Sequence, residues 1–261
     1  MLLVAVTWQV VGVRAPETGA EPGDATHPGA MALRTGAVDP APLLPPPVSI
    51  YDDWVRIENW DCTPMAAFPM DRCTLPTIEP PARRVVLVGD SHVQQLSGAV
   101  VPIAWESNRR LTAIVRGACP FCTASEVVPG EPDCLAWNAA AMEEILAMHP
   151  DTVITLASRD VRAGLTEQTP PGFVEQWRRL DAAGIPVVAL RDTSRFPHSV
   201  RDCVQTRPDD LDSCGTARAD VSARRRSGNR SEKAGEGCVE VGKFGEIEQE
   251  MLLQRSPDRS G

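Results

Sequence analysis

The chain has few lysines, no excess of positive charge and no apolar run long enough to span a membrane. Its formal net charge is −9 over 261 residues, and only two of its 26 lysine and arginine residues are lysines. Nucleic-acid binding needs a basic face that neutralises phosphates, so no nucleic-acid partner is expected. The apolar run within residues 1–13 is shorter than the ~20 residues of a membrane-spanning helix, and no cationic region precedes it. It is either a poor signal peptide or the remnant of a membrane segment.

Metal-ligand spacings are missing as well. No second cysteine or histidine pair with ligand spacing accompanies Cys119-Pro120-Phe121-Cys122. We therefore expect no metal and no cofactor. A thiol–disulfide protein is an alternative interpretation of this motif, because such a pair at a helix N-terminus has a lowered thiolate pKa. Residues 123–133 disfavour it, since they contain Pro129-Gly130 and Pro132 and show no helical period.

Cysteine, by contrast, is abundant, with eight residues. Six of them form short-range couples of the kind seen in loop-closing disulfides: Cys62 with Cys73, Cys119 with Cys134, and Cys203 with Cys214. Disulfides persist in oxidising compartments, so the chain is expected outside the cytoplasm. A set of buried free cysteines is the alternative, because spacing alone does not fix connectivity.

Composition divides the chain into four segments. After residues 1–13, residues 14–50 are rich in proline, glycine and alanine, which predicts a semi-rigid linker. Residues 51–217 carry the folded domain. Residues 218–261 contain both lysines, a run of three arginines and no apolar strand. This last segment is either a natural disordered tail or the product of a shifted reading frame.

Apolar strands and amphipathic helices alternate through the domain. Strands are expected at 85–88, 111–115, 152–156 and 186–190, and helices between them at 93–103, 135–146 and 173–180. The apolar face of the second helix would comprise Leu135, Ala139, Met142 and Ile145 or Leu146. The alternation implies right-handed βαβ crossovers and a parallel sheet covered on both faces. The predicted fold class is α/β, a doubly wound, flavodoxin-like, three-layer sheet that is incomplete at its C-terminus.

The turn Gly89-Asp90-Ser91-His92 follows the first strand and opens the first helix. Functional residues of such folds lie at the carboxyl ends of the strands. Gly89 permits a tight turn, and Ser91 emerges at the sheet edge near the positive end of the helix dipole. A serine nucleophile needs that exposure, and backbone N–H groups of the turn can face an oxyanion. A simple helix N-cap at Asp90 or Ser91 is the alternative interpretation.

The segment Arg83 to Ser97 resembles the first conserved block of SGNH (GDSL-like) hydrolases. Its Gly-Asp-Ser-His variant is typical of SGNH domains attached to acyltransferase family 3 membrane proteins. The resemblance covers roughly residues 50–214. Its further parts are Gly117-Ala118-Cys119-Pro120 after the second strand, Cys134 with Trp137 at the next helix, and a proline-rich spacer after a hydrophobic end.

The resemblance implies that Ser91 is the nucleophile. The backbone N–H groups of Ser91 and Gly117 would then bind the oxyanion. The third family block, Gly-x-Asn, would fall at residues 157–160, where the sequence has no asparagine. Ser158 and Arg159 are candidate substitutes near the substrate.

The catalytic base is the main departure from the family pattern. Family members take it from an Asp-x-x-His pair near the C-terminus, and no such pair follows Cys214. His27 lies in the linker, and His149 precedes the third strand at the opposite sheet edge. His92 is expected to shape the turn. His198 follows the fourth strand and is the remaining candidate base, because it lies at the correct edge.

The resemblance also implies a function. It predicts an acyl ester hydrolase or O-acyltransferase that acts on exported or cell-envelope glycans and is associated with the membrane. An acyl donor, a glycan acceptor and an upstream membrane acyltransferase domain would be its partners. Because the base is missing, this chain is expected to be catalytically incomplete. A non-catalytic glycan-binding or structural module is the competing interpretation.

Overall fold

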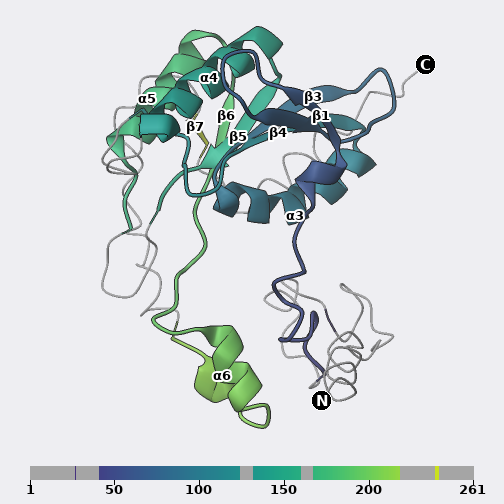
Figure 1. The fold of residues 1–261 in the computed structure, drawn as a ribbon, viewed down its shortest axis with the longest axis vertical. Coiled ribbons are helices and arrows are strands. Elements are labelled where there is room, and N and C mark those ends of the chain that lie inside the picture. Colours follow the sequence, from purple (N-terminus) through teal and green to yellow (C-terminus); the bar gives the residue numbers. More distant parts are fainter. Residues whose placement is uncertain (1–26, 28–40, 124–131, 160–166, 218–238, 241–261) are drawn as a thin grey trace, which may run out of the picture. The chain divides into compact units, whose positions relative to one another are not determined.

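The computed structural model describes residue 27 and residues 41–123, 132–159, 167–217 and 239–240. They belong to two compact units (Figure 1). One unit consists of Met1–Trp54 with His198–Gly215, and the other of Val55–Pro197 with Thr216–Gly261. The predicted domain 51–217 thus contributes to both units, whereas the predicted segment 1–13 lies outside the described residues. No helix of the described ranges is long and apolar enough to cross a bilayer.

The larger unit is built on a seven-stranded sheet in the order β1-β2-β4-β3-β5-β6-β7. Its parallel centre is formed by β4 (Arg109–Val115), β3 (Arg83–Gly89), β5 (Thr152–Leu156) and β6 (Val187–Leu190). Each of these strands coincides with an apolar run of the sequence. The connecting helices are α3 (Ser91–Glu106), α4 (Pro132–Met148) and α5 (Pro171–Ala182). In Figure 1, α3 lies on one face of the sheet and α4 and α5 lie on the other, so the predicted three-layer, doubly wound α/β fold is confirmed.

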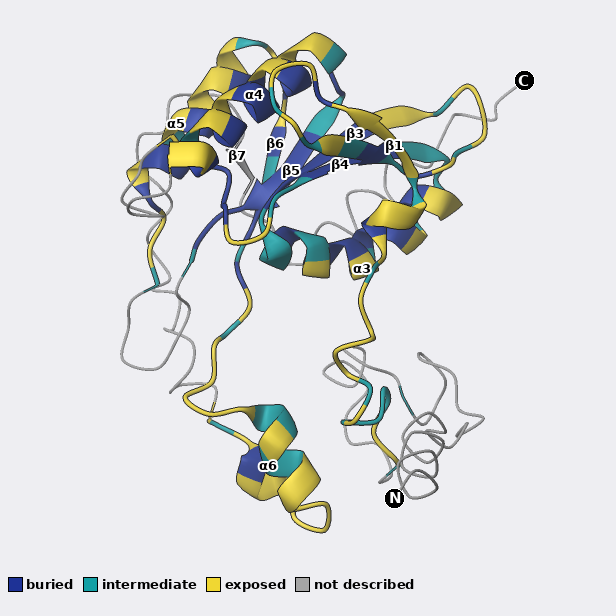
Figure 2. Cartoon of the chain, in the orientation of Figure 1, coloured by how far each residue is buried: buried dark blue, intermediate teal, exposed yellow. Residues whose placement is uncertain are grey.

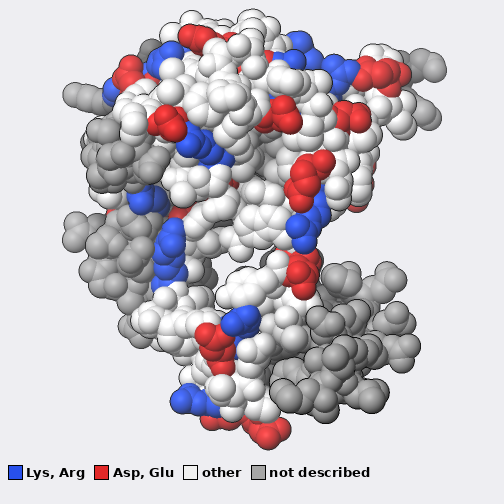
Figure 3. Space-filling view, in the orientation of Figure 1, with Lys and Arg blue, Asp and Glu red and all other residues white. Residues whose placement is uncertain are grey.

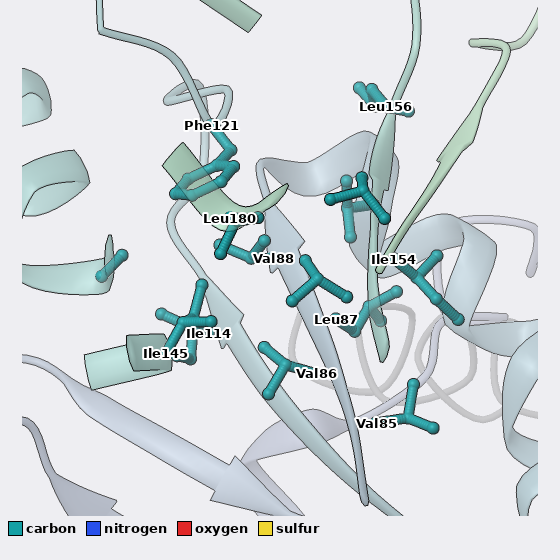
Figure 4. Close-up of a cluster of buried hydrophobic side chains, with 14 of the residues drawn as sticks. Val85, Val86, Leu87, Val88, Ile114, Phe121, Ile145, Ile154, Leu156 and Leu180 are labelled. Atoms are coloured by element: carbon teal, nitrogen blue, oxygen red, sulfur yellow. The ribbon is translucent and has the colours of Figure 1, made fainter. Parts of the chain in front are cut away.

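The strand β3 lies at the centre of the core. Its residues 85–88 are at most 7% exposed, which explains a strand without polar alternation, because helices cover both faces of the sheet (Figure 2). Figure 4 shows side chains of β3 among those of neighbouring elements, including Ile114, Ile145, Ile154 and Leu180. Full burial of such a side chain contributes about 1.5–3 kcal/mol. These contacts anchor β3 and, with it, the turn that follows.

The alternating pattern does not predict the two edges of the sheet. At one edge β1 (Asp61–Pro64) and β2 (Asp71–Thr74) form an antiparallel hairpin that adds to β4. At the other edge β7 (Val239–Glu240) pairs in parallel with β6. The expectation of no strand after residue 218 is therefore wrong at these two residues, and the rest of that tail lies outside the described residues. The sequence pattern that would predict these edge strands is weak, because β7 has two residues and β1 is exposed along its length.

The helix α4 buries a different face from the predicted one. Met142 and Ile145 are buried as expected, but Leu135 is only half-buried and Ala139 and Leu146 are exposed. The buried face instead runs through Cys134, Trp137, Asn138 and Ala141. Two constraints explain this rotation. The disulfide from Cys134 fixes the first turn, and the large indole of Trp137, one turn further, fills the core.

The part of the smaller unit after His198 is a short helical segment closed by a disulfide. It contains α6 (Val200–Thr206) and the 3-10 helix η3 (Leu211–Cys214). Cys203 and Cys214 join the two elements. The guanidinium carbon of Arg201 lies 4.3 Å from the ring centroid of Tyr51, within the range of a cation–π contact.

All three predicted disulfides are present: Cys62–Cys73, Cys119–Cys134 and Cys203–Cys214. The alternative Cys119–Cys122 pair is wrong, because Cys119 is bonded to Cys134. Cys122 is buried, and its backbone N–H donates to Oδ1 of Asn138 at 2.8 Å. The Cys-x-x-Cys motif is therefore part of a stapled loop and does not form a redox pair.

Replacement of both Cys119 and Cys134 by serine is expected to lower the free energy of unfolding by about 3 kcal/mol. The disulfide closes a sequence separation of 15 residues and so restricts the unfolded chain. Urea unfolding without reductant measures the effect. As a control, alkylation of the unfolded, unreduced protein and peptide mass mapping should leave both Cys119 and Cys134 unmodified. Modification of Cys119 would contradict this connectivity.

Candidate functional site

The parallel register brings the carboxyl ends of four strands to one edge of the sheet. This edge is the line of strand ends and differs from the sides formed by β1 and β7. Gly89 at the end of β3 pairs with Val115 of β4, and Leu156 at the end of β5 pairs with Leu190 of β6. The register of β3 with β5 sets Gly89 level with Leu156. The chain leaves β3 toward β4 on one side and enters β5 on the other. This edge is therefore a switch point, where open α/β folds hold their functional sites.

Gly89 makes the turn from β3 into α3. Its φ is +152°, and a Cβ at this position would overlap Cγ2 of Val93. Asp90 is the N-cap of α3, and its Oδ1 accepts a hydrogen bond from the backbone N–H of His92 at 3.0 Å. Ser91 is the first residue of the helix and is half-buried. The capping role thus falls to Asp90, which leaves the hydroxyl of Ser91 at the positive end of the helix.

The hydroxyl of Ser91 has no hydrogen-bond partner among the residues that the structure describes. A serine nucleophile is activated by a base within about 2.6–3.2 Å of its oxygen. Within the described ranges no such base contacts Ser91.

His92 joins the turn to the loop after β6. Its Nδ1 lies 2.6 Å from Oδ1 of Asp192, and that oxygen also accepts the backbone N–H of Thr193 at 2.8 Å. Its Nε2 lies 2.9 Å from a guanidinium nitrogen of Arg195. A carboxylate accepts and a guanidinium donates, so Nδ1 carries the proton and Nε2 accepts from Arg195. The contacts therefore belong to the neutral imidazole.

Asp192 raises the pKa of His92 above its ordinary value of 6.5. The hydrogen bond to Asp192 is the largest cause, and the charges of Asp192 and Asp90 add to it. Burial and the charge of Arg195 act in the opposite direction. Protonation would place an N–H at Nε2, directly facing the Arg195 donor. Only the neutral form of the His92 ring can therefore accept this hydrogen bond from Arg195.

A second cluster ties the loops after β5 and β6. The hydroxyl of Ser158 donates to Oε1 of Glu167 at 3.0 Å, and Nε of Arg191 donates to the same oxygen at 2.5 Å. The hydrogen bonds from Arg191 are the main reason that the pKa of Glu167 is lowered. The backbone N–H of Arg159 donates to the carbonyl of Gln168 at 3.0 Å and so closes this loop. Ser158, predicted to lie near the substrate, thus holds a carboxylate.

Gly117 leaves the end of β4 beside the turn of Ser91. The backbone N–H of Arg116 donates to the carbonyl of Gly89 at 3.0 Å, so the pairing of β3 and β4 continues to the residue before Gly117. Gly117 is exposed, and no atom lies within 4 Å of its missing Cβ. The disulfide of Cys119 anchors the loop two residues further. This fixed glycine is where a backbone N–H for an oxyanion is expected.

The four histidines fall in different places. His92 contacts the loop after β6, whereas His149 follows α4 ahead of β5, at the opposite edge of the sheet. His27 and His198 belong to the smaller unit. There Nε2 of His198 lies 3.2 Å from the carbonyl oxygen of Cys214, and Nε2 of His27 lies 2.7 Å from a backbone carbonyl oxygen. His92 is part of the Ser91 turn and also contacts the loop after β6, which is a larger role than shaping that turn.

Asp192, Arg195, Glu167 and Arg191 are site residues that sequence reasoning missed. Asp192 had a signal, because it follows the fourth strand with only Arg191 between. Polar residues leaving the strand ends are the natural candidates in this fold.

Gly89→Ala is expected to lower the free energy of unfolding by about 1–3 kcal/mol, because alanine is strained at this φ and its methyl group overlaps Val93. Gly98→Ala, in the helix that follows the turn, is the matched control. A Cβ there meets only Cγ2 of Val55 at 3.8 Å, so this variant should be at least as stable as the wild type. Urea unfolding compares the two, and equal destabilisation would argue against the tight turn.

Asp192→Asn is expected to destabilise the protein more at pH 6 than at pH 9. The pKa of His92 is raised on folding, so its contribution to stability is fully present below pH 6.5 and is lost as the pH rises through the folded value. The difference in unfolding free energy between wild type and Asp192→Asn, measured in urea at both pH values, should shrink with rising pH. A difference that is independent of pH would be evidence against the pairing.

Comparison with known proteins identifies the family. The model of the SGNH domain, described as fused to AT3 domains, matches residues 61–240. Among solved structures, the periplasmic domain of a lipopolysaccharide acetyltransferase from Salmonella ser. Paratyphi A is similar, with 11% identity and a TM-score of 0.41 over 52% of this chain and 54% of that chain. Curated protein sequences give no significant match. Because the family match covers more than half of the sequence, the chain belongs to the family of SGNH domains fused to AT3 domains.

Proposed function

We propose that the chain modifies exported or cell-envelope glycans by O-acyl transfer or ester hydrolysis, with Ser91 as the nucleophile. The position of Ser91 carries the proposal. It opens α3 at the carboxyl end of the central strand, and β4, which pairs with β3, ends two residues before Gly117. Membership of the SGNH domain family supports this class of reaction.

The proposed reaction proceeds through an acyl-enzyme. Oγ of Ser91 attacks the carbonyl carbon of an acyl ester and passes its proton to a base. The backbone N–H groups of Ser91 and Gly117 donate to the resulting oxyanion. The bond to the donor oxygen then breaks, and that oxygen takes up a proton as it leaves. A glycan hydroxyl, or water in hydrolysis, attacks the acyl-enzyme and regenerates Ser91.

The base limits turnover in this proposal. The sequence has no histidine after His198, so the Asp-x-x-His pair of the family is absent. The ring nitrogens of His92 are occupied by Asp192 and Arg195. His198 remains the candidate base because of its place in the sequence after β6. We therefore expect slow acylation of Ser91 and little turnover.

The compartment and partners follow from the disulfides and the family. Three disulfides in the described part of the chain support a location outside the cytoplasm. The family description supports a membrane acyltransferase partner domain, which would supply the acyl donor and the membrane association. On the face shown in Figure 3, acidic and basic side chains of the larger unit are interspersed, which favours a neutral sugar hydroxyl over a polyanion as acceptor.

A non-catalytic glycan-binding or structural module is the second candidate. One observation favours it: among the described residues, no base contacts the hydroxyl of Ser91. In that case the Gly-Asp-Ser-His turn would be retained as a capped helix start alone.

Fluorophosphonate labelling of Ser91 separates the two functions. The folded wild-type protein should be labelled slowly at Ser91, whereas a serine at a helix N-terminus that has no activation should not react. Ser91→Ala should abolish the label, and Ser107→Ala, at the other end of α3, should leave it unchanged. Intact-protein and peptide mass spectrometry measure both. A folded wild type that stays unlabelled would favour the non-catalytic module.

A further inference from the structure

Asp192 is a buried carboxylate that the proposed reaction does not use. It is 6% exposed. A buried carboxylate is costly unless hydrogen bonds satisfy it. Asp192 has two such bonds, from Nδ1–H of His92 at 2.6 Å and from the backbone N–H of Thr193 at 2.8 Å. Loss of the His92 ring would leave Asp192 with one of these two hydrogen bonds. The bond between the two side chains therefore restrains the ring strongly.

We propose that Asp192 is a positioning residue for Ser91. It fixes the ring of His92, and neutral His92 in turn holds the guanidinium of Arg195 at the same edge of the sheet. The inference rests on the proposed role of Ser91 as nucleophile.

The two residues His92 and Asp192 are far apart in the sequence and close in space. His92 and Asp192 are 100 residues apart in the chain, and their strands β3 and β6 are separated in the sheet by β5 alone. Ser91 and His92 are consecutive in the first turn of α3. A hydrogen bond on His92 therefore restrains the backbone that carries Ser91. Displacement of a reacting group by about 1 Å can lower a rate about 100-fold, so this restraint matters for the chemistry.

Arg195 makes the arrangement sensitive to protonation. The side chain of His92 faces three charged groups, namely Asp192 and Arg195 from the loop after β6 and Asp90 from its own turn. The neutral ring accepts from Arg195 at Nε2, whereas the imidazolium ring carries a second donor there and repels the guanidinium. Arg195 should therefore leave the site as the pH falls through the pKa of His92. Glu167 and Arg191, on the loops after β5 and β6, are hydrogen-bonded to each other.

The test measures the rate of Ser91 labelling by a fluorophosphonate against pH in the full chain. The wild-type rate should fall as the pH is lowered, with an inflection above pH 6.5, the ordinary pKa of histidine. Asp192→Asn should move that inflection to lower pH and reduce the plateau rate roughly 10- to 100-fold. Asp181→Asn, an exposed aspartate of α5, is the matched control and should change neither quantity. If Asp192 had a structural role alone, Asp192→Asn would not shift the inflection.

His92→Asn is a second test, because asparagine keeps an N–H donor near the position of Nδ1 but has no ionisable ring. Its labelling rate should lose the inflection. NMR titration of the His92 ring should in parallel show a lower pKa in Asp192→Asn. Unchanged rate and inflection in Asp192→Asn, or an inflection that persists in His92→Asn at the same pH as in the wild type, would overturn this inference alone. A folded wild type unlabelled at every pH would overturn the role of Ser91 and this inference with it.

Discussion

Parallel pairing of β3 with β4 on one side and with β5 on the other is the constraint on which the site depends. Because the pairing is in register, the turns after β3, β4, β5 and β6 leave the sheet at one edge. The apolar side chains of β3 are buried on both faces, so the strand is held firmly in the core. Ser91 and Gly117 stand close to that edge as a consequence of the pairing.

Polar contacts between the turns then fix what the strand register brings together. His92 connects the turn after β3 to Asp192 after β6, and Glu167 connects Ser158 to Arg191. The two connections share the loop after β6, where Arg191 and Asp192 are adjacent. A change in either cluster therefore reaches the other through one peptide bond. The charge of Asp192 correspondingly acts on Glu167, whose pKa it raises against the larger lowering effect of Arg191.

The centre of the fold could be predicted from the sequence, because buried parallel strands are continuous apolar runs with no polar alternation. The Gly-Asp-Ser-His turn could be placed for the same reason, and three disulfides followed from cysteine spacing. The edges could not be predicted, since β1 is exposed and β7 has two residues. Nor could the partner of His92, because Asp192 lies 100 residues away and only the sheet order brings the two together.

The central claim is that Ser91 reacts at an edge held together by His92 and Asp192. A crystal structure of the full chain after reaction with a fluorophosphonate tests it most directly. The account predicts a phosphorus atom bonded to Oγ of Ser91, with its oxygen facing the N–H groups of Ser91 and Gly117 and with Nδ1 of His92 still bonded to Asp192. A phosphonyl group on another residue, or an oxygen turned away from Gly117 with His92 detached from Asp192, would contradict it.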